Sequence, residues 1–190
     1  DAMASAQAAY PARIRWLCSL PWEYPDAALG ELSRACDRGA VGVMVLANIA
    51  GRALTDPLFT PVWAEIDRRA LPVLVHPTAP PGVKEMEMAQ FQLTASIGFT
   101  TDTTLAVARM IYDGFFNRFE KLKIIAAHGG GTLPYLIGRL DQCYEHIPAC
   151  RTKTREKPSL HARRIYADAV VFTDDVLAMG GAARPPQERV

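Results

Sequence analysis

The sequence predicts an α/β protein with a parallel sheet. Short apolar stretches alternate along the chain with longer ones whose apolar residues recur at helical spacing. Two of the apolar stretches, 71–75 and 122–127, end directly at a histidine that is followed by residues that interrupt a strand. Because ligands and catalysis gather at the carboxyl ends of the strands in parallel α/β proteins, His76 and His128 are candidate functional residues.

The first predicted strand covers residues 13–20. Asp26 can cap the helix that follows, and Gly39 lies near the end of that helix. Residues 40–46 are almost wholly apolar, which is typical of a parallel strand that is covered on both faces. This part of the chain therefore predicts the order strand, helix, strand.

A second helix is predicted to start at Asp56 and Pro57. Aspartate followed by proline is a strong helix start, because the carboxylate caps free amide groups and proline fits the first helical position. The strand 71–75 follows and ends at His76. Residues 77–101 then form a long connection, and connections of this length often cover a binding site.

The second half of the chain repeats the alternation, and we expect one domain over all 190 residues. Both an open doubly wound sheet and a (β/α)8 barrel fit the pattern, but five strands are too few to close an eight-stranded barrel of about 250 residues. The predicted elements are a helix over 102–110, a strand over 124–127, a helix over 133–147, a strand over 164–172 and a last short helix from Thr173.

Composition and charge exclude several classes of function. The chain is 49% hydrophobic and 22% charged, has a formal net charge of +1, and contains no run of lysine or arginine. Nucleic-acid binding is therefore not expected. No apolar stretch approaches the roughly 20 residues that span a membrane, so we expect no membrane association. The four cysteines form no Cys-x-x-Cys pair, which predicts reduced thiols in a cytoplasmic protein.

His76 and His128 each allow two interpretations. Either side chain can hydrogen-bond a neighbouring backbone group, or it can bind a divalent ion or carry a proton near neutral pH. The three glycines at 129–131 either make a tight turn or bring backbone amides close to a carboxylate. Some lipases and esterases also carry His-Gly-Gly-Gly, but no serine here lies in the Gly-x-Ser-x-Gly context that they require.

Asp168 interrupts an apolar strand, so its carboxylate is expected to be paired or to lie near a metal. An ion pair is the simpler role, and Arg109 or Arg139 can supply the cation. These three residues are the candidates for supporting the site. His146 and His161 lie at a helix end and in a loop, and we expect both to be solvated.

Five short stretches form a combined pattern in a fixed order. They are Val-His-Pro at 75–77, Thr-Thr at 103–104 leading to Gly-Phe-Phe-Asn-Arg-Phe at 114–119, Ala-His-Gly-Gly-Gly at 127–131, Leu-Pro-Tyr at 133–135 with Gly-Arg at 138–139, and Tyr-Ala-Asp-Ala-Val at 166–170. This set resembles the amidohydrolase-2 family, which includes aminocarboxymuconate-semialdehyde, 5-carboxyvanillate and γ-resorcylate decarboxylases. The resemblance covers nearly the whole chain.

The resemblance implies a metal-dependent (β/α)8 TIM-type barrel, of which this chain carries about strands three to seven. His76 matches the family's metal-binding histidine after the fifth strand, and His128 matches its catalytic histidine after the sixth. Family members also carry a His-x-His or Glu-x-His motif after the first strand and an aspartate ligand after the eighth. This sequence has neither.

The reaction implied by the resemblance is metal-dependent decarboxylation of an aromatic or unsaturated carboxylic acid. Zinc is the expected ion, and manganese is the alternative. Hydrolysis of a carbon–carbon bond, a lactone or an amide at the same site is the alternative among enzymes. A non-catalytic fragment that binds a partner or a small acid is the alternative of another class. The resemblance further implies a homodimer that binds a small-molecule carboxylic acid.

Overall fold

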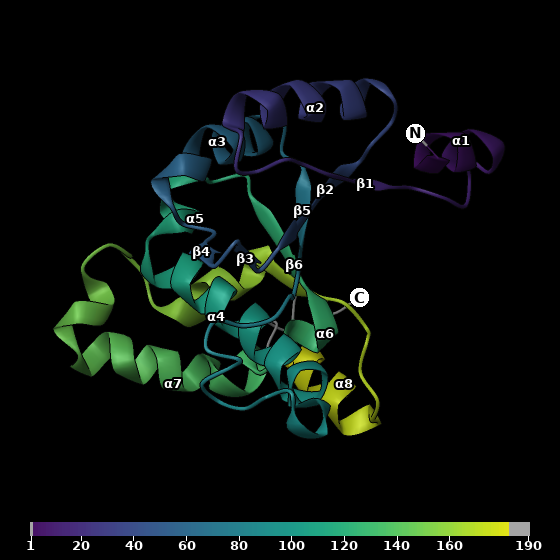
Figure 1. The fold of residues 1–190 in the computed structure, drawn as a ribbon. Coiled ribbons are helices and arrows are strands. Elements are labelled where there is room, and N and C mark those ends of the chain that lie inside the picture. The colour runs from purple at the N-terminus through teal and green to yellow at the C-terminus, as the bar shows by residue number, and fades with distance from the viewer. Residues whose placement is uncertain (1, 183–190) are drawn as a thin grey trace.

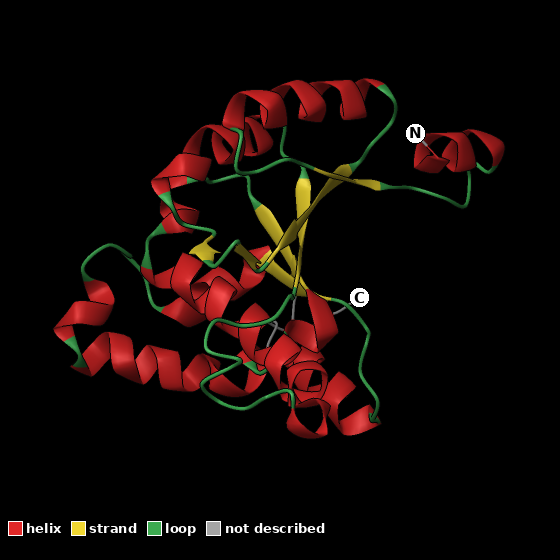
Figure 2. Ribbon diagram, in the orientation of Figure 1, coloured by secondary structure: helices red, strands yellow, loops and turns green. Residues whose placement is uncertain are grey.

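The computed structural model describes residues 2–182, apart from the side chains of residues 163 and 179–182. A twisted sheet runs through the centre and helices lie around it (Figure 1, Figure 2). The sheet contains five parallel strands in the order β1-β2-β5-β6-β7. Their bounds are β1 Leu17–Ser19, β2 Gly42–Leu46, β5 Pro72–His76, β6 Lys123–Ala126 and β7 Ile165–Ala167.

The order of the strands in the sheet follows their order in the chain. Because every neighbouring pair is parallel, each connection must cross over the sheet, as it does in a (β/α)8 barrel. The predicted α/β fold with a parallel sheet is confirmed. The α-helices are α1 Ala2–Ala9, α2 Pro25–Asp37, α3 Thr60–Arg68, α4 Phe99–Tyr112, α5 Phe115–Arg118, α6 Ala127–Gly130, α7 Leu133–His146 and α8 Asp174–Ala182.

Shorter elements occupy the connections between the main strands and helices. An antiparallel hairpin follows β2 and consists of β3 Asn48–Ile49 and β4 Arg52–Ala53. Short helical turns lie at Pro57–Phe59, Gln90–Gln92, Thr94–Gly98, Pro148–Arg151 and Pro158–Arg164. The long connection predicted after β5 therefore contains two of these turns and leads into α4.

The two faces of the sheet differ in burial. Val43 and Val45 of β2 are buried in the core with residues of the helices. Met44 is half-buried and Leu46 is exposed on the opposite face. The prediction that strand 40–46 is covered on both faces is therefore wrong for the described structure. A barrel strand turns one face to the helices and the other to the barrel interior, and this interior face is open here.

Helix α3 supplies the centre of the core. Its apolar face is formed by Val62, Trp63 and Ile66, which are all fully buried. The indole nitrogen of Trp63 donates a hydrogen bond to the carbonyl of Leu54 at 2.9 Å, so burial leaves this donor satisfied. The Trp63 ring meets Phe115 edge to face at 5.1 Å between centroids, a favourable aromatic geometry.

The two predicted helix starts have different outcomes. At Asp56 the prediction is confirmed, because Oδ1 accepts a hydrogen bond from the amide of Leu58 at 2.9 Å. At Asp26 the prediction of a cap is wrong. Pro25 occupies the first helical position one residue earlier, and no described side chain caps α2. Asp26 instead lies in the first turn, where its charge favours the positive end of the helix dipole.

Other predicted boundaries shift by a few residues. Of the strands predicted over 13–20 and 164–172, only the three-residue β1 and β7 form. Both lie at the edges of the described sheet, so each pairs with a neighbour on one side alone. The helix predicted over 102–110 begins earlier, at Phe99, because it continues directly from the preceding helical turn.

Two expectations from composition can be compared with the structure. Within residues 2–182, no helix combines the length and apolar character needed to cross a membrane. All four cysteines are free thiols. Burial raises the pKa of Cys18 to about 11, so this thiol is protonated near neutral pH and is a poor nucleophile.

Candidate functional site

The carboxyl ends of β5 and β6 bring the two predicted histidines together. Val75 and Ala126 are register partners in these neighbouring strands, and the chain leaves the sheet soon after each of them. The rings of His76 and His128 lie 5.6 Å apart between centroids and are inclined by 60°. Two imidazoles from separate strands therefore form the centre of the candidate site.

His76 is the last residue of β5, and its side chain is exposed. Its Nδ1 lies 2.9 Å from the carbonyl oxygen of Pro77. Because a carbonyl only accepts hydrogen bonds, we assign the proton to Nδ1, which leaves the lone pair on Nε2. A neutral imidazole whose second nitrogen is held in this way is the form that binds a metal ion.

His128 lies in the turn α6 and has a left-handed backbone, with φ 57° and ψ 55°. This conformation costs a residue other than glycine about 1–3 kcal/mol, and such strain is concentrated at functional sites. The ring stacks on Phe99 at 6.2 Å between centroids. Its Nδ1 is buried and has no hydrogen-bond partner in the described part of the chain.

Asp168 follows β7 and shapes the loop after β6. Its Oδ1 accepts hydrogen bonds from the amides of Gly129 at 2.8 Å and Val170 at 3.1 Å. The expected ion pair is not formed within residues 2–182, because Arg109 and Arg139 are exposed on α4 and α7 and neither contacts this carboxylate. Two amide groups stabilise the carboxylate in place of a cation.

The glycine loop after His128 packs tightly against α4. A Cβ atom on Gly131 would lie 2.6 Å from Oγ1 of Thr104 and would also meet the carbonyl of Thr100. The amide of Thr132 donates to Oγ1 of Thr104 at 2.8 Å, and the amide of Gly131 donates to the carbonyl of His128 at 3.0 Å. The expectation that this loop binds a carboxylate is therefore wrong for these two amides, which already have partners.

The two histidines expected in solvent differ. His146 is exposed, as predicted. His161 is only 3% exposed, its Nε2 lies 3.2 Å from Oγ1 of Thr154, and its ring stacks on Phe116. The prediction for His161 is wrong because the turn over 158–164 packs against α7 and α4. Burial lowers the pKa of His161, so the neutral form is favoured.

Sequence reasoning missed Asp102, which it assigned only to the start of a helix. This carboxylate is 2% exposed and accepts hydrogen bonds from the Asn48 side chain and from the amide of Thr78. It therefore joins α4 to the segment after β2 and to the segment after β5. A signal was present, because an acid among the apolar and threonine residues of 98–107 needs hydrogen-bond partners if it is buried.

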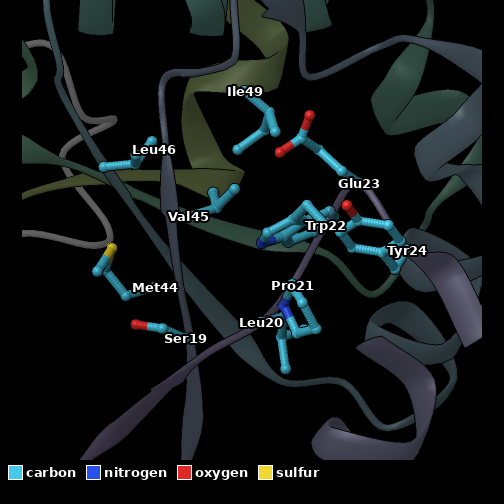
Figure 3. Close-up of a pocket in the computed structure, with 10 residues that line it drawn as sticks. All are labelled: Ser19, Leu20, Pro21, Trp22, Glu23, Tyr24, Met44, Val45, Leu46 and Ile49. Atoms are coloured by element: carbon cyan, nitrogen blue, oxygen red, sulfur yellow. The ribbon is translucent and has the colours of Figure 1, made fainter. Parts of the chain in front are cut away.

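A pocket of about 430 Å³ lies at the carboxyl ends of β1 and β2 (Figure 3). Leu46 in its wall is the register partner of His76, so the pocket lies on the strand next to that histidine. In Figure 3 the ring of Trp22 lies between Val45 and Tyr24, and its indole nitrogen is buried without a partner among the described residues. The lining residues are Ser19, Leu20, Pro21, Trp22, Glu23, Tyr24, Met44, Val45, Leu46 and Ile49.

The described residues fit a metal site only in part. Among them, no group of three or more His, Cys, Asp or Glu side chains could hold a metal ion. Protein metal sites of the zinc type use three or four ligands. His76, with a free Nε2, has the geometry and the tautomer of one such ligand.

The strand order and the paired histidines define a segment of a (β/α)8-type barrel with its site at the carboxyl ends of the strands. The chain belongs to the amidohydrolase family, of the amidohydrolase-2 type, because the family model matches residues 1–178. The resemblance drawn from the sequence is therefore confirmed.

The comparisons also identify individual relatives. The chain is 30% identical over 179 residues to 2-amino-3-carboxymuconate-6-semialdehyde decarboxylase of Dictyostelium discoideum. The matched region covers 93% of this chain and 49% of the relative. It is similar to the structure of 5-carboxyvanillate decarboxylase from Sphingomonas paucimobilis, with a TM-score of 0.87 and 27% identity, over 96% of this chain and 56% of the other. The chain spans about half the length of the curated relatives that it matches.

A third comparison concerns a structure that contains a metal. The dihydroxybenzoic acid decarboxylase from Polaromonas sp. was solved with bound manganese and the inhibitor 2-nitroresorcinol. Its TM-score to this chain is 0.83 over 96% of this chain and 59% of the other, at 22% identity. At that identity the likeness establishes a shared fold.

Proposed function

We propose that this chain carries one metal ligand and the proton-transfer residue of a metal-dependent decarboxylase. The substrate is an aromatic or unsaturated carboxylic acid. The observation that carries the proposal is the pair of His76 and His128, whose rings lie 5.6 Å apart at the carboxyl ends of neighbouring strands. The proposal is supported by relatives whose names describe decarboxylation of a muconate semialdehyde and of γ-resorcylate.

The two histidines have separate roles in this proposal. His76 holds a divalent ion through Nε2, because Nδ1 is engaged by the carbonyl of Pro77. Zinc or manganese, if held there, would supply positive charge that stabilises the oxygens of the substrate. His128 gives a proton to the carbon that loses carbon dioxide. The carbon–carbon bond breaks, its electron pair stays on that carbon, and the transferred proton forms the new carbon–hydrogen bond.

The pocket beside His76 is proposed to hold the body of the acid. Its walls are mainly apolar and aromatic, which suits a ring or a conjugated chain, and its volume lies in the range of small-molecule sites. We also expect the protein to act as a homodimer, which light scattering during gel filtration would test.

Product analysis tests the proposed reaction. The full-length protein is purified, loaded with zinc or with manganese, and incubated with hydroxybenzoates and muconate-type acids in heavy water. Release of carbon dioxide, with one deuterium at the vacated carbon, is the expected result. Incorporation of labelled water oxygen without carbon dioxide would assign the site to a hydrolase. Binding of these acids without turnover by either metal-loaded form would assign the chain to a non-catalytic binder.

A further inference from the structure

Asp102 lies near the start of α4 and is almost completely buried. Its Oδ2 accepts a hydrogen bond from the amide of Thr78 at 3.0 Å. The side-chain nitrogen of Asn48 lies 3.1 Å from each carboxylate oxygen. Neither of these donors belongs to α4, so the carboxylate connects its helix to two other segments of the protein.

The bond to Thr78 involves the same peptide unit that holds His76. The amide N–H of Thr78 and the carbonyl of Pro77 are the two ends of one planar peptide group. The carbonyl end lies 2.9 Å from Nδ1 of His76, and the amide end lies 3.0 Å from Asp102. A buried carboxylate and the imidazole of the candidate metal ligand therefore occupy opposite ends of a single peptide.

We propose that Asp102 is a positioning residue for His76 and acts through the Pro77–Thr78 peptide. The inference rests on the proposed role of His76 as a metal ligand. A carboxylate that accepts from the amide end polarises the peptide, and this makes its carbonyl oxygen a stronger acceptor. The carbonyl then holds the proton on Nδ1 of His76 and keeps the electron pair on Nε2. In many metal sites a carboxylate contacts the ligating histidine directly, whereas here a peptide lies between the two.

The surrounding contacts fix the same segment in space. The side-chain nitrogen of Asn48 also lies 3.2 Å from the carbonyl of Ala79, and its side-chain oxygen accepts from the amide of Gly51. Asn48 thus fixes the carboxylate and the loop after His76 together. Loss of Asn48 would loosen this loop but would leave the bond between Asp102 and Thr78 available, so it gives a matched control.

The wild-type chain provides the first test. Nitrogen-15 shifts of the His76 ring, assigned by comparison with His76→Gln, report which ring nitrogen carries the proton in the metal-free protein at alkaline pH. The proposal requires the Nδ1–H form. A dominant Nε2–H form would overturn it without any further variant.

Variants test the contribution of the carboxylate. Asp102→Ala should give a mixture of the two ring tautomers and a manganese or zinc affinity lower by roughly 10- to 100-fold. Asn48→Ala should keep the Nδ1–H form. Thr78→Pro removes the amide hydrogen but leaves the carboxylate, so it should reproduce the effect of Asp102→Ala even if that variant fails to fold. An unchanged tautomer in a folded Asp102→Ala or Thr78→Pro protein would refute the inference.

The two proposals can fail separately. If His76→Gln binds metal as tightly as the wild type, the role of His76 as a metal ligand is wrong. The tautomer measurements need no metal, so they still decide whether Asp102 controls the ring of His76.

Discussion

The carboxylate of Asp168 accepts a hydrogen bond from the amide of Gly129 at 2.8 Å, and this bond ties the end of β7 to the residue that follows His128. Gly129 has a positive φ of 65°, and a Cβ atom there would lie 2.5 Å from the side chain of Val171. The left-handed backbone of His128 is therefore stabilised by tertiary contacts with the segment that follows β7 as well as by the glycines around it.

Replacement of Asp168 by alanine should destabilise the protein and weaken its activity. The amide of Gly129 is buried and would lose its partner, at a cost of about 1–3 kcal/mol in the free energy of unfolding. We expect a lower kcat with little change in KM, because His128 would lose its position. Asp56→Ala removes a similar bond to a backbone amide far from the site, so it should leave kcat unchanged. Equal kcat values for the two variants would contradict this role.

Gly131 is predicted to tolerate no side chain. Its φ is +63°, and a methyl group would meet Oγ1 of Thr104, so Gly131→Ala should lower the free energy of unfolding by about 1–3 kcal/mol. Gly138 lies inside α7 with open space around it, and Gly138→Ala should raise stability by about 0.5–1 kcal/mol. Urea unfolding measures both. The two variants should change the free energy of unfolding in opposite directions. A Gly131→Ala variant as stable as the wild type would show that the loop can rearrange.

His76→Ala should remove most of the bound metal. The imidazole is exposed at the end of β5 with Nε2 free. Among the described residues, no cluster of three or more His, Cys, Asp or Glu side chains offers an alternative metal site. Elemental analysis of the folded variant after dialysis gives the stoichiometry. His146→Ala removes an exposed histidine remote from this strand end and should keep the wild-type value. If both variants hold the same metal content, His76 is not a ligand.

The sequence predicts the position of His76 and His128 because strand ends are local features. An apolar stretch that stops at a histidine and a proline or glycine is visible within ten residues, and parallel pairing then brings the ends of β5 and β6 together. The aspartate–proline start at Asp56 is visible for the same reason, since the cap and its amide are two residues apart.

The supporting contacts were not predictable in the same way. Asp102 bonds to Thr78, 24 residues away, and to Asn48, 54 residues away, and no local pattern marks such pairs. Asp168 was expected to find a cation, but it is satisfied by backbone amides, which every segment carries and which composition cannot reveal. His161 is buried by the packing of a whole turn, a tertiary effect.

His161 should make the free energy of unfolding depend on pH in the range below the ordinary pKa of histidine. Burial lowers its pKa in the folded protein below the ordinary value of 6.5. As the pH falls through that value, the unfolded chain takes up a proton that the folded protein does not, so the free energy of unfolding decreases until the lower folded pKa is reached. The free energy of unfolding, measured with urea at several pH values between 8 and 5, should change less with pH for His161→Gln than for the wild type. His146→Gln should keep the wild-type dependence of this free energy on pH. An identical pH dependence in all three proteins would contradict the prediction.

Replacement of His128 by asparagine tests whether this residue moves the proton. Asparagine can fill part of the space against Phe99 and tolerates a left-handed backbone better than most residues, so the fold should persist. It cannot act as a general acid near neutral pH, and general acid–base groups contribute about 10²–10⁴-fold to turnover. We therefore expect kcat for the best acid of the substrate panel to fall by about that factor.

The metal content should stay close to the wild-type value, because the ligand His76 remains. A variant that keeps wild-type turnover would show that His128 has a structural role, and one that loses its metal would place His128 among the ligands.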